Sequence, residues 1–122
     1  MAAGAISGFL AVALGAFGAH GLADQIDARA LAAFETGARY QMYHALALLA
    51  VGLLAARENT RALRVAGWAF VAGSFIFSGS LYLLAVSGQR WLGAITPVGG
   101  ISFMTGWIAL AYAAVSGAKA RR

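Results

Sequence analysis

The sequence contains no cysteine, a single proline and few charged residues, and each shortage excludes a class of protein. Without cysteine, the chain has no disulfides, thiolate metal sites, iron–sulfur clusters, thioester lipid anchors or cysteine nucleophiles. Charged residues make up 11% of the 122 residues, less than half of the ~25% that is typical of soluble domains. Hydrophobic residues make up 61%, more than a soluble domain of this length could bury. We therefore predict a single integral membrane domain over residues 1–122.

The charged residues are gathered into short segments that separate four uncharged runs, at residues 1–23, 40–56, 65–89 and 91–118. About 20 helical residues cross a hydrocarbon core of ~30 Å, so each run is close to the length of a transmembrane helix. The pattern predicts an all-α, integral membrane four-helix bundle. We expect its helices at about residues 3–21, 40–56, 65–86 and 97–116.

The segment before the second uncharged run carries a helical signal of its own. Asp27 is a candidate N-cap, and Leu31, Phe34 and Ala38 form one apolar face. This pattern predicts an amphipathic lead-in before the second helix, with a bend at Gly37. The alternative is one long tilted helix of about 27 residues that continues through this glycine.

The single proline predicts where the last helix begins. Pro97 follows Thr96 and precedes an apolar run, which is the order of an N-cap and a first helical residue. We therefore expect the last helix to begin at Pro97, with Thr96 as its cap.

The basic residues predict the orientation of the helices. Of the nine Lys and Arg residues, six lie in the segment between the second and third runs and in the carboxyl-terminal tail, and three lie in the other two connections. The positive-inside rule then places both termini in the cytoplasm. The net charge of +5 is explained by this distribution, so we expect the lipid bilayer as a partner and no nucleic acid.

Two stripes of small residues recur with alternating spacings of three and four, the period of a close helix-packing seam. Together they offer more close-packing surface than one small bundle needs, which favours a homo-oligomer or a subunit of a larger membrane complex. The first seam is Gly4, Gly8, Ala11, Gly15 and Gly18, and the second seam is Gly99, Ser102, Gly106, Ala109 and Ala113.

Polar side chains inside the predicted helices are candidate functional residues, because such groups are costly in lipid. With the predicted orientation they all fall toward the outer leaflet. The candidate pocket consists of His20, Tyr40, Gln41, His44, Ser78, Ser80, Tyr82 and Thr96.

Three interpretations of these polar residues stay open. They could bond to one another as structural contacts between helices. They could form a small-solute, proton or lipid site centred on His44, which would respond to pH because the unperturbed pKa of histidine is ~6.5. Finally, His20 and His44 could bind haem or a metal, although two histidines fall short of a three-ligand zinc site.

The usual sequence motifs of nucleotide hydrolysis, zinc proteases and serine hydrolases are missing from the chain. No nucleophile, base and orienting group can be placed together at a known spacing, so we expect no enzymatic activity and assign no cofactor. The leading hypothesis is a non-enzymatic membrane protein that acts through protein or lipid contacts.

Four ordered blocks together form a known pattern: LGAFGAHGL (14–22), TGARYQMYHALALL (36–49), FSGSLYLLA (77–85) and ITPVGGISFMTGW (95–107). They closely resemble the domain-of-unknown-function family 423, also called uncharacterised protein family 0382, which includes bacterial inner-membrane proteins and the eukaryotic transmembrane protein 256. The resemblance implies a small multi-pass membrane protein, located in bacteria in the cytoplasmic (inner) membrane. It gives no catalytic role to any residue.

Overall fold

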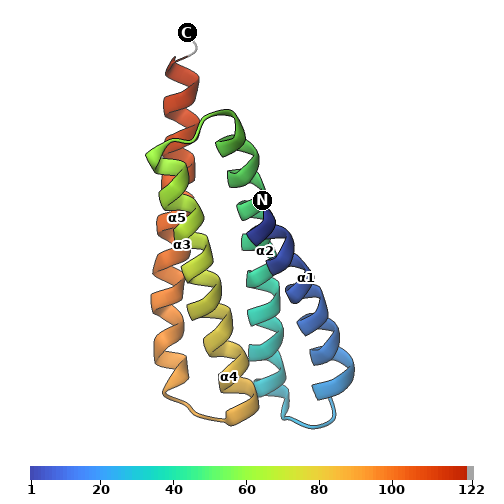
Figure 1. The fold of residues 1–122 in the computed structure, drawn as a ribbon. Coiled ribbons are helices and arrows are strands. Elements are labelled where there is room, and N and C mark those ends of the chain that lie inside the picture. The colour runs from blue at the N-terminus through green and yellow to red at the C-terminus, as the bar shows by residue number, and fades with distance from the viewer. Residues whose placement is uncertain (121–122) are drawn as a thin grey trace.

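The computed structural model describes residues 1–120, except for the side chains of residues 118–120, and over this range the chain is helical without strands. The fold class predicted from the sequence is confirmed. The helices join into four rods that lie side by side (Figure 1). The rods are α1 (Ala2–Phe17) with the π-helical turn η1 (Gly18–Leu22); α2 (Ala28–Arg57); α3 (Arg61–Gly73) with the π-helical turn η2 (Ser74–Ser78) and α4 (Gly79–Ser87); and α5 (Leu92–Ala120).

Local capping explains where α2 begins and where the α3–η2–α4 rod begins and ends. Asp27 caps α2, because its side chain accepts a hydrogen bond of 2.8 Å from the Ala30 amide. Thr60 caps α3 in the same way, through the Leu63 amide at 3.2 Å. At the other end of this rod, Gly88 has a φ of 69° and ends α4 in the left-handed conformation that glycine favours.

The second helix is longer than the predicted one, because α2 runs without a break through the expected bend at Gly37. The lead-in is therefore the first part of α2, and the alternative of one long helix is the one observed. Gly37 instead permits a close approach, since a Cβ there would lie 2.9 Å from Cε1 of Tyr82 and 3.3 Å from Cβ of Leu81.

The last helix begins earlier than predicted, at Leu92, which places Pro97 inside the second turn of α5. The prediction of a start at Pro97 was wrong, because a proline so close to the helix start removes one hydrogen bond and does not prevent the turn before it. Thr96 is not a cap either: its hydroxyl lies 3.4 Å from the Leu92 carbonyl and 2.7 Å from the Ser80 hydroxyl.

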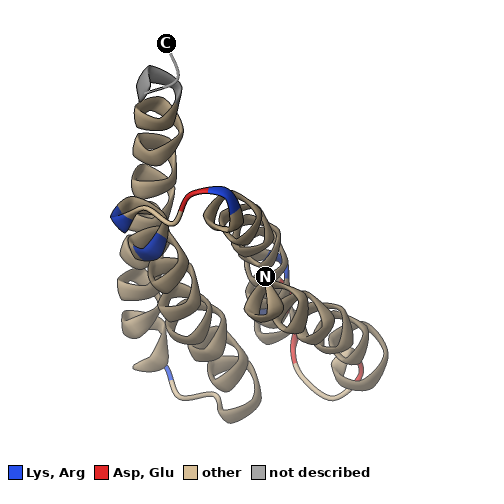
Figure 2. Ribbon diagram, turned by 45° about the horizontal axis from the view of Figure 1, so that its top comes forward, with Lys and Arg blue, Asp and Glu red and all other residues tan. Residues whose placement is uncertain are grey.

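The rods are arranged in the order α1, α2, α3–η2–α4, α5, with α1 and α5 at opposite edges (Figures 1 and 2). The larger apolar core lies between α2, α3 and α5 and includes Leu48, Phe70 and Phe103. A smaller core, centred on Phe34, lies at the end of the molecule that holds the 23–27 and 88–91 connections.

Both small-residue seams are occupied inside the chain. The first seam faces α2, where Cβ atoms added to Gly4 and Gly18 would lie 2.9 Å from the Ala45 carbonyl oxygen and from the Phe34 ring. The second seam faces the α3–η2 part of the neighbouring rod, and there Ser102 donates a 2.7 Å hydrogen bond to the Ala69 carbonyl. The seams therefore give no argument for an oligomer, contrary to the inference drawn from their number.

Three of the rods are long and apolar enough to cross a membrane: Ala2–Leu22, Arg61–Ser87 and Leu92–Gly117. The fourth, α2, does not meet this criterion, so the count of four spanning helices stays a prediction.

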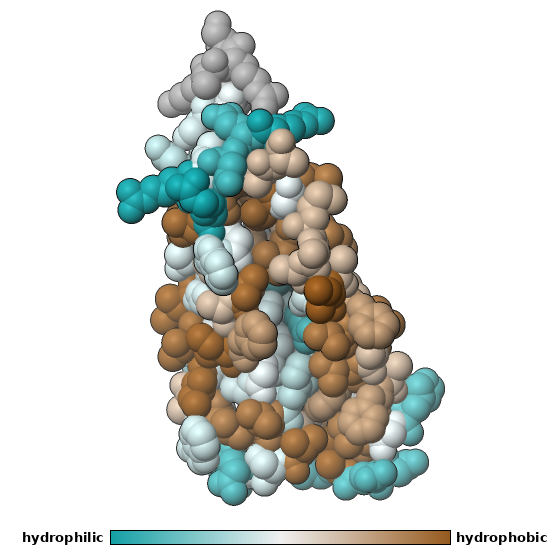
Figure 3. All heavy atoms as spheres, in the orientation of Figure 1, coloured by the Kyte–Doolittle hydropathy of each residue, from teal (hydrophilic) through white to brown (hydrophobic). Residues whose placement is uncertain are grey.

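Large apolar side chains face outward, among them Phe9, Trp68 and Phe75, and brown residues dominate the sides of the molecule in Figure 3. Charged residues gather at the ends, notably at the connection between α2 and α3 (Figure 2).

Candidate functional site

His44 lies in an aromatic cluster between α2, α3 and α5, and it is only 4% exposed. Its ring is stacked on Phe103, with the ring centroids 3.4 Å apart and an interplanar angle of 4°. The rings of Phe70 and Trp107 lie 5.6 Å and 6.0 Å away. His44 therefore fills a closed part of the core and does not line an open pocket.

The hydrogen bonds of His44 determine which ring nitrogen carries the proton. The indole N–H of Trp107 can only donate, and it lies 3.1 Å from Nε2 of His44, so Nε2 accepts. The Tyr40 carbonyl can only accept, and it lies 2.6 Å from Nδ1, so Nδ1 donates. Both nitrogens of the neutral ring are thus satisfied, and neither is free to bind a metal or haem.

His20 lies apart from this cluster, exposed in η1 beside the 23–27 connection. It shares no contact with His44 that would support a two-histidine site. Among the described residues, no three His, Asp or Glu side chains gather where they could hold a metal ion.

Three more of the predicted polar residues tie neighbouring rods together. Ser78 is fully buried and donates a 2.7 Å hydrogen bond to the Gly37 carbonyl on α2. Ser80 joins Thr96 across the interface between α4 and α5 at 2.7 Å. These contacts match the structural interpretation of polar groups between membrane helices.

A cavity of about 350 Å³ lies on another side of α2, between α1 and the α3–η2–α4 rod. Its rim includes Ile6 and Phe75, which are 61% and 78% exposed, so the cavity opens sideways onto the apolar surface of the protein. Figure 3 shows pale and teal atoms recessed between brown ones on this face. The cavity is lined by Ala3, Ile6, Ser7, Leu10, Leu14, Gln41, Leu48, Val71, Ser74, Phe75, Gly79 and Tyr82.

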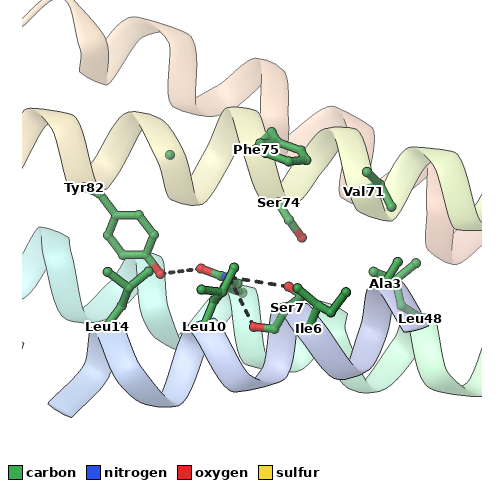
Figure 4. Close-up of a pocket in the computed structure, with 12 residues that line it drawn as sticks. Ala3, Ile6, Ser7, Leu10, Leu14, Leu48, Val71, Ser74, Phe75 and Tyr82 are labelled. Atoms are coloured by element: carbon green, nitrogen blue, oxygen red, sulfur yellow. Dashed lines mark hydrogen bonds between the residues drawn. The ribbon is translucent and has the colours of Figure 1, made fainter. Parts of the chain in front are cut away.

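A chain of hydrogen bonds supplies the polar part of this cavity (Figure 4). Tyr82 donates to Oε1 of Gln41 at 2.6 Å. The amide nitrogen of Gln41 donates to the Ser7 carbonyl at 3.2 Å and lies 3.5 Å from the Ser7 hydroxyl. The chain connects α4, α2 and α1 across the cavity, and Gln41 is its central member.

Ser74, at the start of η2, contributes one more polar group to the same cavity. Its hydroxyl oxygen is buried and has no hydrogen-bond partner. Figure 4 shows this hydroxyl pointing across the cavity toward α1. π-Helical turns inside α-helices are frequent at functional sites, and η2 forms part of this wall.

The predicted pocket residues thus do not form one site. Gln41 and Tyr82 line the cavity, whereas His44, Ser78, Ser80 and Thr96 belong to packed interfaces. Tyr40 is 39% exposed, with its ring centroid 4.8 Å from that of Phe77, and His20 is exposed and apart from both groups. The sequence argument omitted Ser7 and Ser74, although both are hydroxyl residues inside uncharged runs and the same rule could have found them. Gln41 lies near the middle of its rod, and not toward one end as predicted, and Ser74 lies near the middle of the rod opposite.

Comparison with known families identifies the group to which the chain belongs. Residues 14–100 match the model described as "Protein of unknown function (DUF423)". The chain belongs to the DUF423 family. The chain is 50% identical over 113 residues to the UPF0382 membrane protein YwdK of Bacillus subtilis, with 92% of each chain covered.

Other relatives agree with this assignment. The chain is 44% identical over 117 residues to the UPF0382 inner membrane protein YgdD of Escherichia coli, covering 91% of this chain and 85% of the relative. It is 50% identical over 109 residues to a UPF0382 membrane protein of Haemophilus influenzae, covering 88% and 86%. No solved structure matches the chain. This DUF423 chain is therefore a membrane protein of an uncharacterised family, as its sequence blocks predict.

Proposed function

We propose that this DUF423 protein is a non-enzymatic binding protein that holds one lipophilic molecule in the cavity between α1 and the α3–η2–α4 rod. The observation that carries the proposal is the cavity itself: about 350 Å³, with mostly apolar walls and the Ser7–Gln41–Tyr82 chain of hydrogen bonds in its lining. This volume lies at the lower end of the ~300–1,000 Å³ range of ligand pockets, which also combine apolar walls with a few placed polar groups.

The setting of the cavity supports a ligand that arrives from the bilayer. Ile6 and Phe75 at its rim are exposed, like the other large apolar side chains on the outer surface of the rods. The opening lies near the middle of the rods, which the predicted membrane spans would place within the bilayer. A lipid-soluble molecule can then enter sideways without passing through water.

The arrangement of His44 argues against a binding site centred on this residue. Both of its nitrogens are engaged by Trp107 and Tyr40, and its ring is stacked on Phe103. We assign it a structural role and place Gln41 at the centre of the binding site. The full use of both seams inside the chain also makes a lipid contact a better supported role than an oligomer.

Gly79 offers a direct test, because it lines the cavity and a Cβ there would meet no atom within 4 Å. Gly79→Leu should fill the cavity without a backbone clash. Gly117→Leu is the matched control, since Gly117 also has open space around it and lies outside the cavity.

The measurement is native mass spectrometry of protein extracted gently from its own membrane. We expect a stoichiometric lipophilic mass on the natural protein and on Gly117→Leu, and its loss from Gly79→Leu. Equal occupancy in the two variants would overturn the proposal, as would a natural protein that carries no ligand.

A further inference from the structure

The unpartnered hydroxyl of Ser74 is the strongest indication of what the cavity holds. Among the buried side-chain nitrogen and oxygen atoms of the described residues, this oxygen alone lacks a hydrogen-bond partner. A hydroxyl buried in apolar surroundings without a partner is unfavourable, and the absence of water in a bilayer core makes it more so. Ser74 lines the cavity near the middle of its rod, so a molecule inside the cavity would be placed to supply that partner.

The polar groups of the cavity that keep free hydrogen-bonding capacity can each donate. The carbonyl oxygen of Gln41 already accepts from Tyr82, and one N–H of its amide group donates to the Ser7 carbonyl. The second N–H of Gln41 has only a 3.5 Å approach to the Ser7 hydroxyl, and the Ser74 O–H has no partner. The Ser74 hydroxyl can donate or accept, but the second Gln41 N–H can only donate, so a ligand with an acceptor oxygen suits both groups.

The charge of the lining limits the ligand further. No Lys, Arg, His, Asp or Glu side chain lines the cavity. A carboxylate, phosphate or ammonium group would therefore lie in apolar surroundings without a counter-ion, which is strongly unfavourable. An uncharged acceptor such as a ketone, ester or quinone carbonyl has no such requirement.

We propose that the cavity binds an uncharged lipophile whose carbonyl oxygen accepts a hydrogen bond from the Ser74 hydroxyl near the middle of the helical rods. This inference rests on the proposed function, because it names the chemical class of ligand for the same cavity. The apolar walls hold the hydrocarbon part of the ligand, and the Ser74 and Gln41 donors select its oxygen.

The experiment compares a long-chain methyl ketone with the alkane of the same chain length, both titrated into purified protein in dodecyl maltoside and followed by native mass spectrometry. Four variants are needed. Ser74→Ala removes the donor, Ser74→Thr keeps a hydroxyl, and Gly79→Leu fills the cavity. Ser87→Ala is the control, because Ser87 is exposed and its hydroxyl donates to the Leu83 carbonyl outside the cavity.

We expect the natural protein and Ser87→Ala to bind the ketone more tightly than the alkane. Ser74→Ala should weaken ketone binding about 3- to 10-fold, the equivalent of one hydrogen bond, and leave alkane binding unchanged. Ser74→Thr should restore much of the ketone preference.

Two outcomes separate the failure of this inference from failure of the proposed function. If Gly79→Leu abolishes binding of both probes but Ser74→Ala changes neither, the cavity is the site and the carbonyl preference is wrong. If Gly79→Leu leaves the binding of both probes intact, the cavity is not the site and both proposals fail. Circular dichroism of each variant separates lost binding from lost folding.

Discussion

Two adjacent glycines of α5 provide a stringent test of how the rods pack. A Cβ on Gly99 would lie 2.7 Å from both Cα and Cβ of Phe77 on the neighbouring rod. A Cβ on Gly100 would meet only Cδ2 of the same phenylalanine, at an ordinary distance of 3.9 Å. Gly99→Ala and Gly100→Ala therefore each add one methyl group to α5. The methyl group at Gly99 overlaps the backbone of Phe77, and the one at Gly100 has room.

The expected change in the stability of each variant follows from two opposing effects. Replacing glycine by alanine inside a helix stabilises it by about 0.8–1.0 kcal/mol, and this gain is common to both variants. Overpacking costs about 1–3 kcal/mol, and it applies only to Gly99→Ala. The backbone of Phe77 cannot rotate away as a flexible side chain would, so we expect the upper part of that range.

The assay is unfolding in mixed detergent micelles, with tryptophan fluorescence as the signal. Gly100→Ala should be as stable as the natural protein or slightly more stable, and Gly99→Ala should be less stable than Gly100→Ala by about 2–3 kcal/mol. Equal stability of the two variants would refute the close approach of α5 to η2. A larger loss of stability in Gly100→Ala than in Gly99→Ala would mean that α5 is rotated, so that Gly100 and not Gly99 faces Phe77.

Two further predictions concern the aromatic cluster and the orientation of the chain. Trp107→Phe leaves Nε2 of His44 buried without its donor, and we expect unfolding measurements to show a loss of about 1–3 kcal/mol, whereas Trp68→Phe, at a side chain 74% exposed, should change little. Because the chain has no cysteine, Asn59→Cys and Gln89→Cys each provide a single labelling site. A membrane-impermeant maleimide added to intact cells should label Gln89→Cys only, and the reverse pattern would contradict cytoplasmic termini.

Local features of the fold could be predicted from the sequence because their causes are local. Asp27 caps α2 through an amide three residues away, and Gly88 ends α4 through its own backbone conformation. The start of α5 could not be predicted in this way. A proline is compatible with either the first or the second helical turn, and the hydroxyl of Thr96 bonds to Ser80 on another rod.

The candidate site depended on contacts between rods, which the sequence pattern does not give. The role of His44 is determined by Trp107, 63 residues further along the chain, so its position in a helix gave no indication that both nitrogens are engaged. The cavity was missed for a related reason. It is a space between α1 and η2, and it depends on the order in which the rods are arranged. Gln41 could be identified without that order, because a polar side chain within an apolar run is visible in the sequence alone.

The position of α2 between more apolar rods has a consequence for biogenesis. On the scale of translocon-mediated insertion, a charged residue at the centre of a helix opposes insertion by about 2.5–3.5 kcal/mol, and α2 carries Arg29, Glu35 and Arg39 in its first half. The preceding rod, α1–η1, lies alongside α2 and is joined to it by residues 23–27 alone. We therefore expect α1–η1 and α2 to insert together as a hairpin, because the more apolar α1–η1 offsets the cost of placing α2 in the lipid. A nascent chain that lacks α1 would leave α2 at the membrane surface, where quality-control proteases could reach it.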